Sequence, residues 1–199
     1  MHPHPPGSPG SSPSIRCKLA PAMALLALLT ALPTLLRAQM TATEAEIEAA
    51  FLYNFARYVR WPGEDEKVFP LCVHAADQIV EPLRRAVGGK QVGAAPIEIR
   101  QVEEPDEMRE CRILFLGDGS DIDDLVPRLA DASVLTVSDQ SGFAQRGGII
   151  GFRREDKRLQ LDINLDRAEH ARLTISSQLL KLARIVKADG LPPNDLPGH

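Results

Sequence analysis

The chain has 199 residues, enough for one domain with a buried core, and carries 27 acidic against 23 basic side chains. A net charge of -4 argues against nucleic-acid binding, because affinity for nucleic acids rests on basic contacts to phosphates. No segment matches a His-Glu-x-x-His, Gly-x-Ser-x-Gly, phosphate-loop or dinucleotide-binding motif. The sequence therefore predicts no catalytic centre and no cofactor.

Residues 1–38 have the layout of a cleaved secretory signal peptide. Arg16 and Lys18 precede an apolar run over residues 19–36, and a small residue stands at the expected cleavage edge. An uncleaved membrane anchor is the alternative, but two prolines shorten the run, and a spanning helix needs about 20 apolar residues. Cleavage would remove three of the 23 basic residues and no acidic one, which leaves a net charge of -7. We expect an exported protein, located in the periplasm of a Gram-negative cell.

Export also decides the chemistry of the cysteines. Cys17 leaves with the signal peptide, and Cys72 and Cys111 remain. Two thiols in an oxidising compartment usually pair, so we predict a disulfide that closes a loop of about 40 residues. A metal site formed by Cys72, His74 and Cys111 is the alternative, although three ligands are few and a disulfide would consume both sulfurs.

The first mature element is an amphipathic helix that begins near Glu44 and ends at Trp61-Pro62. Its predicted buried stripe repeats about every fourth residue and consists of Ile47, Phe51, Leu52, Phe55, Ala56 and Val59. Asn54 and Tyr58 lie at the edge of this stripe. Either Asn54 is a buried, hydrogen-bonded polar group that fixes the register of the helix, or Asn54 and Tyr58 line a pocket.

Strands and helices then alternate along the chain. We predict strands over residues 67–74, 97–102, 112–117 and 133–137, helices over 78–87 and 125–130, and a polar connection over 105–110. Further on we predict a β-hairpin from residues 148–152 and 159–163, a short helix over 164–171, and a final helix from Ser176 through Val186.

This order predicts an α/β fold, a layered sandwich with a mainly parallel central sheet, an N-terminal amphipathic helix and a C-terminal β-hairpin plus helix. We expect residues 39–187 to form a single domain and residues 188–199 to form a flexible tail. The glycines of residues 142–148 lead into a strand, so a turn is favoured over a phosphate loop. The acidic run over residues 118–124 lacks the spacing of a calcium loop, which favours a solvated loop.

Two groups of residues are candidates for binding a protein partner, because they combine polar or aromatic anchors with expected exposure. The first group, on the outer side of the first helix, is Tyr53, Arg57, Arg60 and Trp61. The second group lies near the hairpin, within residues 164–172, and consists of Asn164, Arg167, His170 and Arg172.

Five segments resemble the YfiR-like family of exported proteins. They are residues 49–62 (AAFLYNFARYVRWP), 134–139 (VLTVSD), 142–148 (GFAQRGG), 163–165 (INL) and 173–186 (LTISSQLLKLARIV), in the same order as in the family. The resemblance covers residues 41–187, and its first and last segments are long and specific. Cys72 and Cys111 match the positions of the family's structural disulfide. A second cysteine pair, which some members carry near the segment matching residues 144–152, is absent here.

The resemblance implies a periplasmic, non-catalytic α/β protein that forms a homodimer. It also implies that the protein binds and represses the periplasmic sensor domain of an inner-membrane diguanylate cyclase, and that an outer-membrane lipoprotein can sequester it. The output would be control of cyclic di-GMP, and through it of biofilm and motility. The alternative is a periplasmic small-molecule sensor or solute-binding module with a pocket near the first helix, and a third hypothesis is an enzyme or metal protein that uses the two cysteines and His74.

Overall fold

The computed structural model describes residues 44–63, 67–156 and 158–188. The predicted signal peptide and the predicted tail beyond residue 188 lie outside these residues. Within them, no helix has the length and apolar character needed to cross a membrane.

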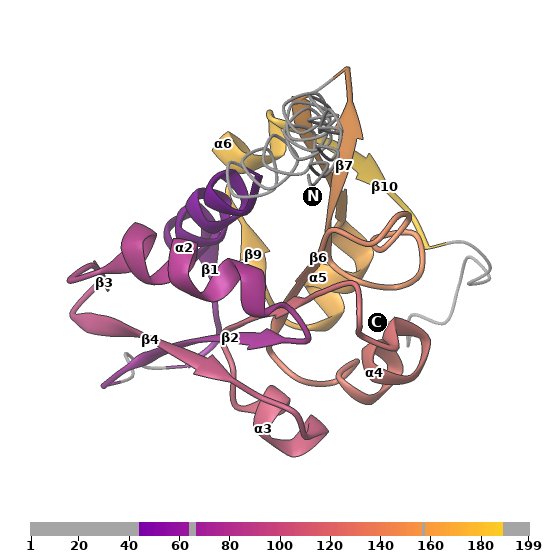
Figure 1. The fold of residues 1–199 in the computed structure, drawn as a ribbon. Helices are drawn as coiled ribbons and strands as arrows, with labels where there is room; N and C mark the ends of the chain where they lie inside the picture. The colour runs from indigo at the N-terminus through magenta and orange to yellow at the C-terminus, as the bar shows by residue number, and fades with distance from the viewer. Residues whose placement is uncertain (1–43, 64–66, 157, 189–199) are drawn as a thin grey trace, which may run out of the picture. The chain divides into compact units, whose positions relative to one another are not determined.

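The central element is an eight-stranded sheet with the order β10-β8-β7-β6-β5-β2-β4-β3 (Figure 1). The strands are β2 (Phe69–His74), β3 (Gln91–Val92), β4 (Ala95–Gln101), β5 (Ile113–Leu116), β6 (Leu135–Ser138), β7 (Ile150–Glu155), β8 (Arg158–Asn164) and β10 (Ala183–Val186). The five strands from β4 to β7 are parallel, whereas β3 at one end and β8 with β10 at the other run in the opposite direction. The α/β fold with a mainly parallel sheet is therefore confirmed.

Helices cover both faces of the sheet. An N-terminal helix over residues 44–58 and α2 (Asp77–Val87) lie on one side, and α3 (Pro105–Arg109) and α4 (Ile122–Arg128) lie on the other (Figure 1). Every residue of β5 is buried. Ile113 and Phe115 belong to the hydrophobic core on one face of the sheet, and Leu114 and Leu116 belong to the core on the other face. This two-sided burial explains why the strand has a continuous apolar sequence.

The N-terminal helix is present, and four of its six predicted stripe residues are buried: Leu52, Phe55, Ala56 and Val59. The other two are not, since Ile47 is 45% exposed and Phe51 is only half-buried. Ala45, Glu48 and Ala49 are buried instead, so the buried side is rotated away from Ile47 and Phe51 in the first half of the helix.

The C-terminal segment also differs from its prediction. The helix that Ser176 caps is α6 (Ser177–Leu180), which is only one turn long, and the chain then forms strand β10. The apolar spacing of this segment fits a helix or a strand equally well. The pairing with β8 decides between them, because it satisfies the backbone groups along the edge of that strand.

Other local predictions are mostly confirmed. The hairpin forms as β7 and β8, and residues 164–171 form α5 (Leu165–His170) with Asn164 as its N-cap. The prediction of a polar connection over residues 105–110 is wrong, because this segment forms helix α3. Glu104 and Glu107 form a reciprocal capping box there, and Pro105 occupies the first turn.

The predicted disulfide is present between Cys72 on β2 and Cys111, which follows α3, with a Cα–Cα distance of 5.9 Å. His74, two residues after Cys72, is held through Nδ1, which lies 2.9 Å from the backbone oxygen of Val102. Both sulfurs are thus in the bridge, and the described residues contain no group of three or more side chains suited to a metal ion.

Candidate functional site

The first group of candidate partner residues lies on and just after the N-terminal helix. Arg57 is exposed, and its guanidinium lies 5.9 Å from the ring centre of Tyr53 and 5.7 Å from that of Tyr58. Lys90 lies 4.1 Å above the Tyr53 ring. Tyr53 therefore forms a half-buried aromatic platform with two cations on it, and its exposed edge stays available to a partner.

Arg60 ends strand β1 (Val59–Arg60) and Trp61 follows it, and the two residues differ in how they are held. Arg60 is exposed, whereas the indole Nε1 of Trp61 donates a hydrogen bond to the backbone oxygen of Arg112 at 2.9 Å. The Trp61 ring also packs edge-on against Phe69, with ring centres 5.2 Å apart. Trp61 thus holds β1 against the sheet, and only part of its surface can meet a partner.

Asn164, from the second group, is not a surface residue. Its exposed fraction is 0%, its Nδ2 donates to the backbone oxygen of Ala144 at 2.9 Å, and its Oδ1 accepts from the backbone N–H of Arg167 at 3.1 Å. Asn164 therefore caps α5 and holds the loop around Ala144. Prediction of this residue as a partner contact is wrong, because its amide is fully occupied inside the protein.

The other three residues of the second group lie at or near the surface. Arg167 is half-buried and donates from Nε to the backbone oxygen of Gly147 at 3.0 Å, and burial lowers the pKa of its guanidinium. His170 and Arg172 are exposed, and Arg172 reaches the hydroxyl of Ser133 at 3.2 Å. His170 and Arg172 can therefore meet a partner, while Arg167 mainly supports the neighbouring loop.

A short two-stranded ladder brings the two groups together. Strand β1 pairs antiparallel with β9 (Thr174–Ile175), with Arg60 opposite Thr174. Three exposed arginines flank this ladder: Arg57 two residues before β1, Arg60 on it, and Arg172 two residues before β9. Among the described residues, none of the three forms an ion pair with a carboxylate. We call Arg57, Arg60 and Arg172 the arginine surface.

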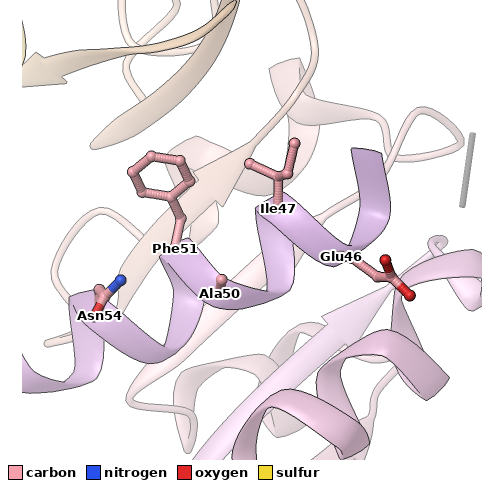
Figure 2. Close-up of a pocket in the computed structure, with 5 residues that line it drawn as sticks. All are labelled: Glu46, Ile47, Ala50, Phe51 and Asn54. Atoms are coloured by element: carbon pink, nitrogen blue, oxygen red, sulfur yellow. The ribbon is translucent and has the colours of Figure 1, made fainter. Parts of the chain in front are cut away.

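A shallow apolar hollow of about 290 Å³ lies on the outer side of the N-terminal helix. Figure 2 shows Ile47 and Phe51 pointing to the same side of the helix, with Ala50 and Asn54 beside them and Glu46 pointing elsewhere. The predicted pocket residue Asn54 thus lines a hollow, whereas its companion Tyr58 does not line this one. Glu46 is tied to α2 through an ion pair with Arg85 at 3.0 Å.

The usual ligand site of a parallel α/β sheet is closed here. Such sites lie beyond the carboxyl ends of the strands where the strand order reverses, which in this sheet is between β2 and β5. Gly117 follows β5 at this place, and a Cβ atom on it would lie 2.2 Å from the backbone oxygen of Ala75. The two loops are therefore in close contact, and they leave no crevice at this position.

Two carboxyl groups, one buried and one half-buried, interact near the end of β6. Glu48, on the N-terminal helix, is 5% exposed, and Asp139 follows the end of β6. Burial and the nearby carboxylate of Asp139 raise the pKa of Glu48 to about 8. Burial and the charge of Asp118 raise the pKa of Asp139 as well. Neither Oε1 of Glu48 nor Oδ1 of Asp139 has a hydrogen-bond partner among the described residues.

Asp139 also lines a polar cavity of about 410 Å³ against the β7–β8 hairpin and β10. A buried carboxylate, Asp162 on β8, organises the wall of this cavity. Burial alone would raise the pKa of Asp162, but hydrogen bonds from Arg184, Arg153 and Gln145 outweigh it and hold the pKa below its ordinary value. The Arg184–Asp162 contact ties the edge strand β10 to β8 at 2.5 Å.

These carboxyl groups were not predicted from the sequence. Glu48 was passed over because the predicted stripe ran through Ile47 and Phe51, whereas the buried side passes through Ala45, Glu48 and Ala49. Asp139 had a second signal, since polar residues that end parallel strands often form ligand sites.

Comparison with known protein families decides the assignment. A model of the family described as YfiR/HmsC-like matches residues 45–184, which is most of the chain. The chain belongs to the YfiR/HmsC-like family.

Among solved structures, this YfiR/HmsC-like protein is similar to a conserved domain protein from Vibrio cholerae (13% identity, 61% of this chain and 55% of that one, TM-score 0.43). It is also similar to an ABC domain in complex with L-Trp from Streptococcus pneumoniae (10% identity, 59% and 55%, TM-score 0.41). A third similar chain is a ligand-free, open substrate-binding protein with adhesive properties from Clostridium difficile (10% identity, 62% and 56%, TM-score 0.43). The protein spans about 55% of the length of the first of these chains, and TM-scores this low carry no functional argument.

The YfiR/HmsC-like segments of the sequence have a structural explanation in this protein. In residues 142–148, the Phe143 ring packs so closely on Gly148 that a Cβ atom there would lie 2.1 Å from a ring carbon. Asn164, from the segment 163–165, holds the same loop through Ala144. The glycine-rich segment is therefore a packed turn that forms one wall of the Asp139 cavity, as the turn prediction required.

Proposed function

We propose that the protein binds and represses the periplasmic sensor domain of an inner-membrane diguanylate cyclase, and that the arginine surface is its contact. The observation that carries this proposal is the grouping of Arg57, Arg60 and Arg172 beside the β1–β9 ladder, where none of them forms an ion pair with a described carboxylate. In a chain with excess acidic residues, such a surface favours a partner segment rich in Asp and Glu.

Arginine suits this role for a physical reason. Its planar guanidinium can bind a carboxylate through two parallel hydrogen bonds and can stack on aromatic rings. Tyr53 beside Arg57 and the half-buried Trp61 after Arg60 supply aromatic surface within the same patch. Aromatic residues and arginine together are the types enriched where binding energy concentrates.

The test measures binding and repression with purified components. The mature protein would be titrated against the periplasmic domain of a diguanylate cyclase from the same cell, and cyclic di-GMP synthesis by the full-length cyclase would be followed in vesicles. We expect Arg60→Glu to weaken binding by about tenfold or more and to relieve repression, with a reduced salt dependence of the association rate. Arg84→Glu is the matched control, because Arg84 is exposed on α2, away from the ladder.

Full affinity in the Arg60→Glu variant, together with full repression, would refute the assignment of this surface. If no diguanylate cyclase of the cell bound the wild-type protein, the repressor function itself would be refuted. An outer-membrane lipoprotein that sequesters the protein would compete with the cyclase domain in the same titration, and we propose such competition as the release mechanism.

We also propose a homodimer. Leu182 and Ile185 are 67% and 48% exposed, and Ile185 belongs to β10, the edge strand of the sheet. Exposed apolar side chains on an edge strand favour association with another chain. Sedimentation of the wild type should give a dimer and that of Ile185→Arg a monomer, whereas a monomeric wild type would contradict the proposal.

The final part of the proposal concerns processing. Residues 1–38 are proposed to be a cleaved signal peptide, residues 39–187 a single domain and the remainder a tail. Intact mass and N-terminal sequencing of the protein recovered from the periplasm would test this proposal. Recovery of the protein with its N-terminal segment retained would refute it.

A further inference from the structure

The cavity beside Asp139 holds a carboxyl group that forms no ion pair within the described chain. Three arginines line this cavity, and each is already paired: Arg184 with Asp162, Arg153 with Asp162 and Glu155, and Arg154 with Glu44. Asp139 forms no ion pair with any described residue. The lining therefore has its positive groups neutralised and one carboxyl group left over.

The unsatisfied hydrogen-bonding capacity of the site consists of acceptors. Oδ1 of Asp139 and Oε1 of Gln145 both belong to lining residues, and both are buried without a partner among the described residues. Oε1 of Glu48 is a third such atom, on a residue that is 5% exposed and 3.9 Å from a nitrogen of the lining residue Arg154. Among described side chains, no buried nitrogen donor is without a partner. A ligand that satisfies this site must therefore bring donors.

The size and the remaining lining restrict the ligand further. A volume of about 410 Å³ lies at the small end of the range for small-molecule pockets. Phe143, Phe152 and Leu159 provide apolar surface for a short hydrocarbon body. Calcium and magnesium need six or more oxygen ligands, and the described residues contain no cluster of three side chains suited to a metal.

We propose that this cavity is a binding site for a small primary amine, bound as its ammonium ion by the carboxylate of Asp139 and the amide oxygen of Gln145. An ammonium group has three N–H donors and a positive charge, which match the acceptors and the uncompensated carboxyl group. The site goes beyond the proposed partner surface, because it lies on the Asp139 edge and uses none of the three arginines of that surface.

Protonation gives the site a distinctive signature. Around Glu48 lie Asp139, Glu44 and Asp118, which raise its pKa, and Arg154, which lowers it. Around Asp139 lie Asp118 and Glu44, which raise its pKa, and Arg154, which lowers it. Because an ammonium ion stabilises the ionised carboxylates, its binding should expel protons from the site. The affinity should therefore increase as the pH rises through the neutral range.

The experiment uses the mature protein and a matched pair of probes, n-butylamine and 1-butanol, titrated calorimetrically at constant ionic strength. We expect n-butylamine to bind with proton release, detected in two buffers of different ionisation enthalpy, and 1-butanol to bind about tenfold or more weakly. Asp139→Asn should weaken amine binding about tenfold and abolish the proton release. Asp131→Asn should change neither, because Asp131 is exposed and paired with Arg109.

Four results would overturn the proposal: equal binding of the two probes, no amine binding beyond a matched salt control, unchanged amine affinity in Asp139→Asn, or displacement of the amine by magnesium chloride. Asp139→Asn keeps the shape of the side chain and removes a buried charge, so its melting temperature should equal or exceed that of the wild type. Failure of this proposal would leave the cyclase titration unaffected, since that test depends on Arg60.

Discussion

Replacing Glu48 by Gln should stabilise this protein, although Glu48 is buried and belongs to the first helix. Gln keeps the shape of the side chain and cannot ionise. The folded protein holds the pKa of Glu48 at about 8, against 4.5 for an ordinary Glu. Compared with a side chain that stays neutral in both states, Glu48 therefore lowers the free energy of unfolding by about 3 kcal/mol at pH 7 as an upper estimate.

The sign of the pH dependence follows from proton binding. Between the unfolded pKa of 4.5 and the folded pKa of about 8, the folded state holds more protons on Glu48 than the unfolded state does. The wild type should therefore lose stability as the pH rises through this window. Glu48→Gln lacks this loss, so the gap between the two free energies of unfolding should widen from near zero at about pH 5 toward about pH 8.

Urea denaturation of both proteins across this pH range measures the gap directly. Asp139 also has a raised pKa, but it is present in both proteins, so most of its contribution cancels in the difference. Glu81→Gln is the control, since Glu81 is exposed on α2 and should give a small difference without this trend. Equal free energies of unfolding for the two proteins, or a difference that does not grow with pH, would contradict this reasoning. Either result would show that Glu48 is solvated and that it does not hold a buried proton beside Asp139.

The remaining predictions concern the disulfide and the loop of residues 142–148. Cys72→Ser should lower the free energy of unfolding by about 2–5 kcal/mol in urea melts; equal stability of the variant and the oxidised wild type would disprove a stabilising bridge. Asn164→Ala should cost about 1–3 kcal/mol, because it removes the α5 cap and the bond to Ala144. Thermal melting tests this variant, and an unchanged midpoint would contradict the buried role of Asn164. Gly148→Ala should cost about 1–3 kcal/mol, since its Cβ would meet the Phe143 ring; near-ultraviolet circular dichroism would report the displaced ring, and a native spectrum with native stability would refute the close packing.

Local patterns were sufficient for much of the fold. The apolar run from residue 112 to 117 predicted a strand buried on both faces, and β5 has that burial. The hairpin, helix α2 and the short helix α5 were likewise predicted, because turn residues and apolar period act over a few neighbouring positions. Each of these elements carries its signal within its own segment.

The errors arose where the partner of a segment decides its structure. The sequence of residues 183–186 favours a strand no more than a helix. These residues form β10 because they pair with the edge of β8, and because Arg184 forms an ion pair with Asp162 on that strand. Ile47 is exposed, whereas Ala45 and Ala49 beside it are buried. Asn164 was placed among surface residues because it is polar. In the structure its side-chain amide is buried and hydrogen-bonds to the backbone of Ala144 and of Arg167 in α5.

The sequence by itself thus determined the α/β class, the family and the pairing of Cys72 with Cys111, because these depend on local period, motif order and cysteine count. Only the tertiary structure brought Arg172 beside Arg57 and Arg60, and Glu48 beside Asp139. These residues are far apart in the chain, and the β1–β9 ladder and the end of β6 bring them together. Charges interact through space, so neither the raised pKa values of Glu48 and Asp139 nor the missing ion pairs of the three arginines leave a pattern in the sequence.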